Sequence, residues 1–455
     1  MAAALAGVLG VGLAAGCAAV PGDASAVERS PLPVSRPATL PTEEPPAAAP
    51  AGAAETSPTA SPAPAEIASA DSADTIATAV AAPASFAAWR AQFRAKALAA
   101  GIPAATFDDA FAGVRVNATV LERDRFQPEF TRPIWQYLDS AVSDLRVRNG
   151  QRLADEKAVL MAEIEAKHGV DSAVVLAIWG LESAYGANYG SMRVIESLAT
   201  LAYDSRRQAF AERELLAALR ILAAGDIAPA RMVGSWAGAM GHTQFIPTSF
   251  EAYAVDHDGD GRRDVWSADA ADALASTANY LARFGWRQGA PAAVEVRLPE
   301  GFDYGLAGGK PQSAATWTAL GVRPTVGGAL TPADTVEIIL PAGADGPAFA
   351  TYPNFDVIKR YNNATSYALA VSHLADRIEG APPFQAPWPR DDRALSRDET
   401  REVQRLLTAR GYDTQGVDGI VGPQTRAAVR AFQSATGKVP DGYVSDRLLD
   451  ALRDG

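Results

Sequence analysis

The chain has 455 residues, enough for about three domains of ordinary size. Hydrophobic residues make up 48% and charged residues 21%, as in soluble globular proteins. Because 41 Lys and Arg stand against 53 Asp and Glu, the net charge of -12 disfavours nucleic acid as a partner. A single cysteine forms no intramolecular disulfide, and the four histidines lack paired zinc-ligand spacing, so a zinc enzyme is not expected.

Residues 1–17 form an uncharged apolar run that ends in LAAGC. The run is too short to span a bilayer and has the length of a signal-peptide core. Its end resembles a bacterial lipobox, which implies lipid attachment to Cys17 and, with Ala18 next, sorting to the outer membrane. Ala14 stands where Leu is usual, and the missing basic start suggests a start methionine further upstream. A simple cleaved secretion signal is the alternative, and both interpretations predict export.

Residues 18–85 are rich in Ala, Pro, Ser, Thr and Glu and contain almost no large apolar side chains. Such a segment cannot bury enough surface to offset the entropy lost on ordering. We therefore expect a disordered tether between the N-terminal segment and the folded part of the chain.

Helical spacing of apolar residues begins at Phe86 and continues to about Ala224. Two short segments, 294–298 and 335–340, alternate as strands do and predict a small β insertion within 291–350. Capping residues and glycines predict individual helices over 86–98, 154–168, 172–185 (after Asp171 as N-cap), 213–224 and 355–378. The expected fold class is mainly α.

Glu182 is the one carboxylate in the apolar run 174–186. On a helix, Ile178 and Trp179 lie one turn before it, and the helix end adds the negative end of the dipole. Both effects favour the protonated form, which suits a general acid that protonates a glycosidic leaving oxygen. A solvent-facing glutamate at a helix end is the alternative.

Two further segments read SWAGAMGHTQFIPTSF at 235–250 and RYNNATSYA at 360–368. Together with WGLES at 179–183 they closely resemble the membrane-bound lytic murein transglycosylase B family, glycoside hydrolase family 103, over about residues 86–380. The resemblance implies a lysozyme-like helical core and makes Glu182 the sole catalytic acid/base, with no catalytic cofactor. It also implies a saccharide groove lined by Ser235, Gln244, Tyr361, Asn362, Tyr367, Tyr137, Arg206, Arg207 and Tyr280, of which Tyr137 and Tyr280 suit core packing equally well.

The family reaction needs one carboxylate, because the acetamido oxygen of an N-acetylmuramyl sugar supports the reacting centre and its 6-hydroxyl closes a 1,6-anhydro ring. Hydrolysis by a muramidase is the nearest alternative, if Asp204 or Glu212 supplies a second carboxylate. A non-catalytic wall-binding protein is the rival from another class.

The segment 256–264 places acidic residues at loop positions 1, 3, 5 and 9 and glycine at position 6, as EF-hand loops do. Asp256, Asp258, Asp260 and the Arg262 carbonyl are the expected ligands of a structural calcium or sodium ion. Ser267 replaces the usual glutamate at position 12, and the family's lengthened loop implies Asp272 as the completing ligand, with Asp269 second. A solvated acidic turn is the alternative.

The C-terminal segment 394–453 begins with Ser396 and Glu399 as a capping box. Its Asp-Gly, Gly-Pro-x-Thr and Phe-Gln elements resemble the three-helix peptidoglycan-binding domain. The complete prediction is therefore a signal (1–17), tether (18–85), catalytic domain (86–380), linker (381–393) and peptidoglycan-binding domain (394–453). We expect a monomer in the periplasm that binds peptidoglycan glycan strands and is anchored to the outer membrane.

Overall fold

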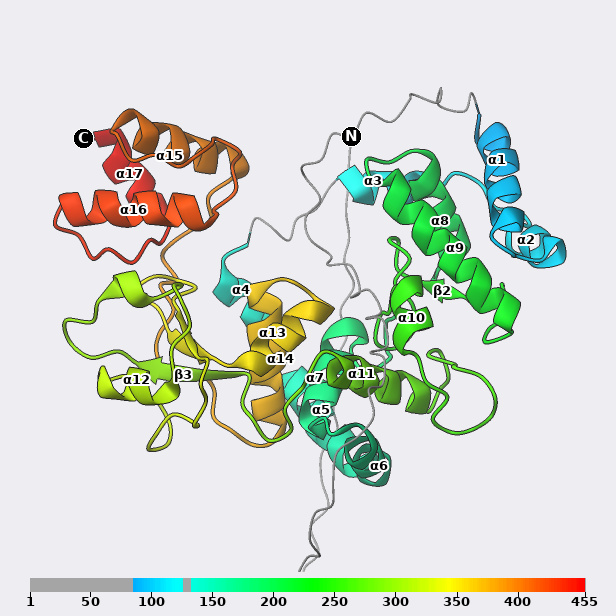
Figure 1. The fold of residues 1–455 in the computed structure, drawn as a ribbon, viewed down its shortest axis with the longest axis horizontal. Coiled ribbons are helices and arrows are strands. Elements are labelled where there is room, and N and C mark those ends of the chain that lie inside the picture. Colours follow the sequence, from blue (N-terminus) through cyan, green and yellow to red (C-terminus); the bar gives the residue numbers. More distant parts are fainter. Residues whose placement is uncertain (1–84, 126–131, 455) are drawn as a thin grey trace, which may run out of the picture. The chain divides into compact units, whose positions relative to one another are not determined.

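The computed structural model describes residues 85–125 and 132–454 (Figure 1). The chain divides into two units, 1–64 and 65–455, and every element described below belongs to the second. The predicted signal, the lipidation at Cys17 and the tether lie outside the described residues. Among the helices that are described, none is both long and apolar enough to cross a membrane.

Helices dominate the described residues, as the sequence predicted. Those of the large helical region are α1 (Phe86–Ala99), α2 (Ala104–Ala110), α3 (Ala118–Arg125), α4 (Ile134–Ala141), α5 (Asp144–Glu156), α6 (Ala158–His168), α7 (Ser172–Ser183), α8 (Val194–Tyr203), α9 (Gln208–Ala224), α10 (Pro247–Tyr253), α11 (Ala271–Arg283), α13 (Pro353–Tyr361) and α14 (Thr365–Ile378). The short α12 (Ala314–Ala319) and a 3-10 turn (Tyr304–Leu306) accompany the β insertion.

The β insertion is an antiparallel sheet with strand order β4-β3-β6-β5. Its strands are β3 (Ala293–Arg297), β4 (Arg323–Pro324), β5 (Glu337–Ile339) and β6 (Ala348–Thr351). The register pairs Val294 with Ala350 and Ile338 with the same Ala350, and Trp317 of α12 is buried in the small core under the sheet. A two-stranded ribbon of β1 (Met192–Arg193) and β2 (Val233–Gly234) lies within the helical region.

The centre of the helical core is α7, which contacts α5, α6, α11 and α14 (Figure 1). Residues 173–180 of this helix are all buried, because its sequence is apolar on every side rather than on one stripe. Such a helix is stable only inside a protein. The carboxylate at its C-terminal end is therefore held by a rigid, completely packed element.

Several helix boundaries differ from the sequence predictions. Helix α7 ends at Ser183 rather than residue 185, because Ala184 and Tyr185 adopt left-handed backbone angles. Helix α9 begins at Gln208, five residues before the predicted start at 213. The predicted helix 355–378 is two helices, α13 and α14, separated at residues 362–364.

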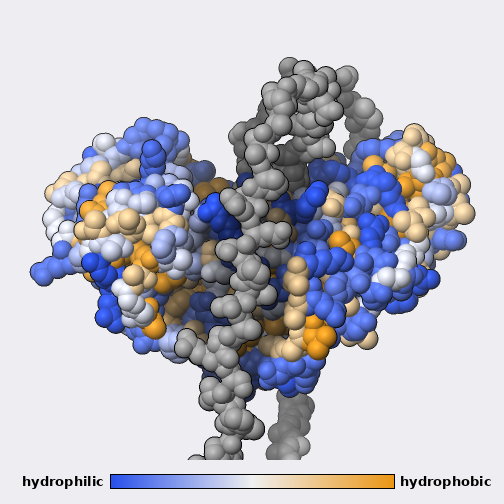
Figure 2. Space-filling model, turned by 60° about the horizontal axis from the view of Figure 1, so that its bottom comes forward, coloured by the Kyte–Doolittle hydropathy of each residue, from blue (hydrophilic) through white to orange (hydrophobic). Residues whose placement is uncertain are grey.

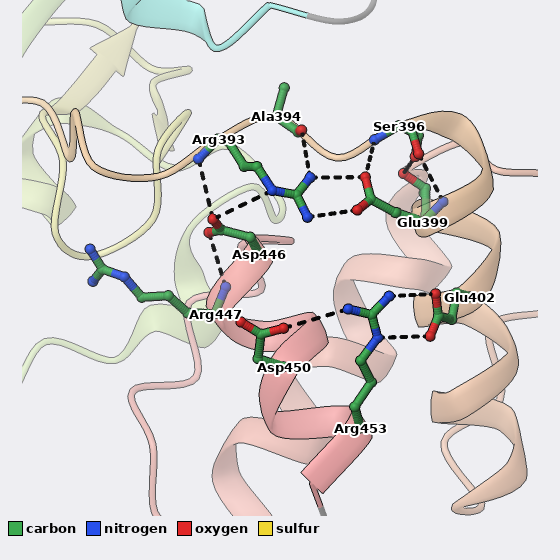
Figure 3. A network of polar contacts seen from close by, with 10 residues as sticks. Arg393, Ala394, Ser396, Glu399, Glu402, Asp446, Arg447, Asp450 and Arg453 are labelled. Atoms are coloured by element: carbon green, nitrogen blue, oxygen red, sulfur yellow. Dashed lines mark hydrogen bonds and ion pairs between the residues drawn. The ribbon is translucent and has the colours of Figure 1, made fainter.

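Three helices form the C-terminal region: α15 (Arg397–Ala409), α16 (Pro423–Ala435) and α17 (Asp446–Asp454). The predicted capping box is present, since the Ser396 hydroxyl accepts from the Glu399 amide and the Glu399 carboxylate accepts from the Ser396 amide. The small core is formed by Val403, Leu407, Ala428, Val429, Phe432, Leu448, Leu449 and Leu452. Arginines and carboxylates pair along α15 and α17, Arg393 with Glu399 and Arg453 with Glu402 (Figure 3).

The surface in Figure 2 is mainly hydrophilic, and hydrophobic residues occur on it in small scattered groups. Such scattered apolar residues are ordinary for a soluble protein surface. On the face that Figure 2 shows, they form no large apolar patch outside the grey atoms.

Candidate active site

Glu182 lies in the last turn of α7, with part of its side chain accessible and its backbone fixed in the packed core. The residues one turn earlier, Ile178 and Trp179, are 0% and 3% exposed. The predicted apolar surroundings are therefore present. A group in such a position loses most of its hydration while a ligand can still reach it.

The Tyr367 hydroxyl, from α14, donates a hydrogen bond of 2.6 Å to Glu182 Oε1. Burial raises the pKa of Glu182 to about 7, and the Tyr367 hydrogen bond, which favours the carboxylate, offsets only part of this effect. Glu182 is thus poised to give up and take back a proton near neutral pH. Tyr367 is 4% exposed, so it fixes the carboxylate from the buried side.

The chain turns sharply after Glu182. Ala184, Tyr185 and Gly186 have φ angles of 50°, 61° and 85°, and left-handed backbone is costly for the two residues that carry a Cβ. The Tyr185 hydroxyl donates to the Arg146 carbonyl at 2.9 Å, and a Cβ on Gly180 would lie 2.6 Å from the Tyr185 ring. Tertiary contacts therefore hold this strained turn in place.

The segment 235–246 folds into a series of tight turns, and its His242 forms hydrogen bonds with α7. Ser235 Oγ accepts from the Ala239 amide at 3.0 Å. Gln244 has a φ of 54°, and its side-chain amide donates to the Tyr189 and Gly241 carbonyls at 3.0 and 2.9 Å. Its amide nitrogen thus has a structural task, which leaves Oε1 as the atom suited to a ligand.

Tyr361 and Tyr280 belong to one aromatic cluster. Their ring centroids are 5.1 Å apart, and Phe245 lies within 5.9 Å of each of them. The Tyr361 hydroxyl donates to the Thr243 carbonyl, and the nearby charge of Glu182 is one cause of its raised pKa, after burial. Tyr280 is 7% exposed and donates to the Arg360 carbonyl, so its position is that of a core residue that supports Tyr361.

The remaining groove predictions fall in different places. Tyr137 on α4 is near enough to contribute to the raised pKa of Tyr367, whereas Asn362 is exposed just after α13. Arg206 and Arg207 both bind Asp124 of α3, through its carbonyl at 3.5 Å and its carboxylate at 2.8 Å respectively. The structure therefore gives the two arginines a contact with α3, and their predicted role in sugar binding stays a prediction.

The two alternative carboxylates lie on other elements. Glu212 on α9 forms an ion pair with Lys96 of α1, and Asp204 is exposed and directly follows α8. The pKa of Glu182 is set by burial and by Tyr367. Neither Asp204 nor Glu212 is among the causes of that pKa shift.

Sequence reasoning missed the residues that hold the end of α7. Ser183 is 2% exposed, donates to the His242 carbonyl at 2.6 Å and accepts from the Gly186 amide at 2.9 Å. Trp179 Nε1 donates to His242 Nδ1 at 3.1 Å. The signal for Ser183 was its place beside Glu182, and for His242 a histidine between glycine and threonine in a segment of small residues.

The acidic loop, residues 256–264, brings three predicted ligands together. Carboxylate oxygens of Asp256, Asp258 and Asp260 lie within 4.8 Å of one another, the one cluster of this kind among the described residues. Asp256 also accepts from the Gly259 and Gly261 amides at 2.7 and 2.9 Å. Hard oxygen donors at this spacing fit a calcium-type cation.

Asp272 is 2% exposed and lies outside that three-carboxylate cluster. Its two oxygens accept from the amides of His257 and Asp264, at 2.7 and 2.8 Å, and so fasten both ends of the acidic loop. Asp269 accepts from the Ser267 hydroxyl at 2.8 Å. The Arg262 carbonyl, Asp272 and Asp269 therefore stay predicted ligands of the ion.

Residues 85–376 match the family described as Transglycosylase SLT domain, and residues 396–452 match a peptidoglycan binding domain family. The first match spans well over half of the chain. The protein therefore belongs to the SLT transglycosylase family and has a C-terminal peptidoglycan-binding domain. Its fold is the mainly helical, lysozyme-like fold of that family.

Individual proteins that are similar to this chain support this assignment. Membrane-bound lytic murein transglycosylase B of Escherichia coli (strain K12) is 33% identical over 219 residues, which cover 46% of this chain and 58% of that protein. SltB3 from Pseudomonas aeruginosa, solved in complex with NAG-anhNAM-pentapeptide, is 51% identical with a TM-score of 0.78, over 81% of this chain and 100% of that one. Slt35 of Escherichia coli, solved in complex with calcium, is 28% identical with a TM-score of 0.55, over 64% and 92%.

Proposed function

We propose that the protein is a lytic transglycosylase that cleaves the β-1,4 bond between N-acetylmuramic acid and N-acetylglucosamine in peptidoglycan and forms 1,6-anhydromuramyl products. The observation that carries this proposal is Glu182, an acid with a pKa of about 7 that is held by Tyr367 at the end of a buried helix. Membership of the SLT family and the 51% identity to SltB3 support it.

In the first step, protonated Glu182 gives its proton to the glycosidic oxygen as the bond to the anomeric carbon breaks. The substrate's own acetamido oxygen supports the positive centre that forms there. In the second step, the Glu182 carboxylate takes the proton of the muramyl 6-hydroxyl, whose oxygen attacks the anomeric carbon. No water is consumed, and Glu182 regains the proton it lost.

Glu182 becomes a carboxylate in the first step and acts as a base in the second. The Tyr367 hydroxyl can donate to this carboxylate and so serves both steps. A pKa of about 7 means that the two protonation states have similar free energies, so neither step must pay a large penalty. Glu212 is held in an ion pair with Lys96, which supports a mechanism in which Glu182 acts without it.

The test is digestion of purified peptidoglycan by the wild-type protein and by Glu182→Gln, followed by mass spectrometry of the released fragments. Muropeptides one water lighter than the reducing forms, lost with Glu182→Gln, would support the proposal. Reducing-end products would indicate a muramidase. Binding to the wall without release would indicate the non-catalytic class.

We also propose that the C-terminal domain binds peptidoglycan and so keeps the catalytic domain near its substrate, since linking two modules raises their effective concentration. The proposed domain bounds are 86–380, 381–393 and 394–453, with the protein acting as a monomer. The family match at 396–452 supports the last of these domains. Sedimentation with purified wall should weaken when residues 394–453 are deleted, while the oligomeric state is read by analytical ultracentrifugation.

We propose further that the protein is exported to the periplasm and anchored to the outer membrane through lipid on Cys17. The lipobox-like LAAGC segment supports this, as does the membrane-bound relative of Escherichia coli. Labelling with a radioactive fatty acid should mark the wild-type protein and fail with Cys17→Ala. Labelling that persists in the variant would overturn the proposal.

Finally, we propose that the acidic loop binds a structural calcium ion through Asp256, Asp258, Asp260 and the Arg262 carbonyl. The clustered carboxylates and the calcium complex of Slt35 support this. Calcium should raise the melting temperature of the wild-type protein, and Asp258→Asn should lower calcium affinity at least about tenfold. The matched control is Asp109→Asn, which removes an exposed carboxylate of α2 and should leave calcium affinity unchanged.

A further inference from the structure

His242 occupies the junction between the acidic loop and the end of α7. It is 6% exposed, and it forms hydrogen bonds to both sides. Toward α7, its carbonyl accepts from Ser183 at 2.6 Å and its Nδ1 accepts from Trp179 Nε1 at 3.1 Å. Toward the segment after the loop, its amide donates to the Val265 carbonyl at 3.0 Å and its Nε2 lies 2.8 Å from the Ser267 carbonyl.

These contacts define the tautomer of His242. An indole N–H only donates, so Nδ1 must be the unprotonated acceptor for Trp179. Nε2 then carries the hydrogen and donates it to the Ser267 carbonyl. With the neutral ring, Trp179 donates a hydrogen bond to His242, and His242 donates one to the Ser267 carbonyl.

The junction has little room to adjust. A Cβ on Gly186 would lie 2.4 Å from the His242 ring, and a Cβ on Gly241 would lie 2.3 Å from the Val265 carbonyl oxygen. The backbone therefore approaches His242 and Val265 as closely as glycine allows. A displacement of residues 265–267 must move His242, because packed interiors do not deform freely.

The acidic loop joins this junction directly through the chain. It ends at Asp264, whose amide donates to Asp272, and the next residue, Val265, accepts from His242. Without a cation, the clustered carboxylates of Asp256, Asp258 and Asp260 repel one another. A bound cation removes this repulsion and fixes the loop, and with it Val265.

On the other side, Ser183 is the residue that follows Glu182, and it holds the strained turn. Its hydroxyl accepts from the Gly186 amide and its carbonyl accepts from the Asn188 amide, both at 2.9 Å. Lys157 forms a second, parallel link, because it donates to the Asp269 carbonyl and lies 5.8 Å from the Trp179 ring centroid.

We propose that His242 is a positioning residue that transmits the order of the acidic loop to the turn beside Glu182, so that a cation in the loop stabilises the catalytic geometry. This inference rests on the proposed cation site and adds to it a task in catalysis. The backbone of His242 connects Val265 to Ser183, and its side chain connects Ser267 to Trp179.

The experiment measures hydrogen–deuterium exchange of the full chain with calcium and with a chelator, in peptides that cover the acidic loop and in peptides that cover residues 179–188. Calcium should slow exchange in both segments of the wild-type protein, by about tenfold at the Gly186 and Asn188 amides. In His242→Phe, which keeps a ring but loses both side-chain hydrogen bonds, calcium should still protect the loop but protect residues 179–188 less than about threefold.

Three variants keep the test decisive. Trp179→Phe removes the same hydrogen bond from the other side and should also weaken the transmission, even if His242→Phe proves unstable. His242→Gln, which can still direct an N–H toward Ser267, should restore part of it. The matched control is His373→Phe, since His373 is also buried but stacks on Phe384, and it should keep the wild-type response.

Activity provides a second readout. Calcium should raise kcat more than it lowers KM in the wild-type protein, and His242→Phe should lose this response. Protection of the loop with no change in residues 179–188, or an unchanged response in His242→Phe, would overturn the inference. If calcium failed to protect the loop itself, the cation site would be wrong and the coupling with it, whereas the Glu182 digestion test would stand independently.

Discussion

Glu182 of the catalytic domain and Glu399 of the C-terminal domain are both glutamates, but their environments are opposite. Burial raises the pKa of Glu182 to about 7. Hydrogen bonds from Arg393, then from the Ser396 backbone, lower the pKa of Glu399 to about 2. Figure 3 shows the second case, with the Arg393 guanidinium donating to both oxygens of Glu399 at 2.9 and 2.6 Å.

The difference in pKa follows from the surroundings of each carboxylate. Glu399 is charged at neutral pH, caps α15 and remains near water, so its contribution is to stability. Among the described residues, Glu182 accepts a hydrogen bond from Tyr367 and has apolar neighbours one turn earlier, so the energies of its two protonation states are close. A carboxylate can exchange its proton near neutral pH when no charged partner stabilises its ionised form.

The sharpest way to test this comparison is to neutralise each glutamate and measure activity. Glu182→Gln should lower the release of anhydromuropeptides about 1,000-fold, because it removes the only proton donor in the proposed mechanism. Glu399→Gln should leave the release rate within about twofold, since its site is distant in function from the chemistry. Equal losses in both variants would refute the assignment of the catalytic acid.

Removing the Tyr367 hydroxyl should have the next largest effect. Tyr367→Phe deletes the hydrogen bond that favours ionised Glu182, so the pKa of Glu182 should rise further above 7. The alkaline limb of the pH–rate profile should move to higher pH, and kcat should fall about tenfold. Tyr361→Phe is the comparison variant, because that hydroxyl donates to the Thr243 carbonyl, and it should leave the alkaline limb in place.

The two glutamates should also affect stability with opposite pH dependence. The folded-state pKa of Glu182 is raised, so the penalty for charging it is absent below about pH 4.5 and complete above pH 7. Glu182→Gln should therefore match the wild-type protein at pH 4 and exceed its stability at pH 8, by up to about 3 kcal/mol. Thermal or chemical unfolding at the two pH values measures this, and a gain that is equal at both would contradict the raised pKa.

The smallest expected effect is at Glu399. Its folded-state pKa is lowered, so its stabilisation is present above about pH 4.5 and disappears as the pH falls through 2. Because the pair with Arg393 is near water, Glu399→Gln should cost only about 0.5–1 kcal/mol at pH 7. Ser396→Ala should cost about 1 kcal/mol at any pH, since it removes the cap itself. A loss from Glu399→Gln that is undiminished well below pH 2 would show that packing, and not charge, is responsible.

The sequence predicted several elements whose signals are local. The capping box of α15 and the glycine that ends α6 are both present. The two predicted strands of the β insertion are β3 and β5, and both pair with β6. These features depend on residues a few positions apart, so one segment of sequence contains the whole cause.

Asp171 shows where local reasoning fails. It is the N-cap residue of α7, as predicted, but its side chain makes no capping hydrogen bond. It accepts instead from Trp286 and Gly289, while Glu165 of α6 accepts from the amide and hydroxyl of Ser172. The capping task passed to a residue on another helix, which no local pattern indicates.

The sequence by itself determined that Glu182 is a lone carboxylate in an apolar helix and that three aspartates at 256–260 share a loop. Only the tertiary structure decided that Tyr367, 185 residues away, is the hydrogen-bond donor to Glu182, and that His242 joins the acidic loop to Ser183. The physical reason is that burial and hydrogen-bond geometry depend on which segments fold against one another. Local sequence defines the reactive group, and long-range packing sets its pKa and its position.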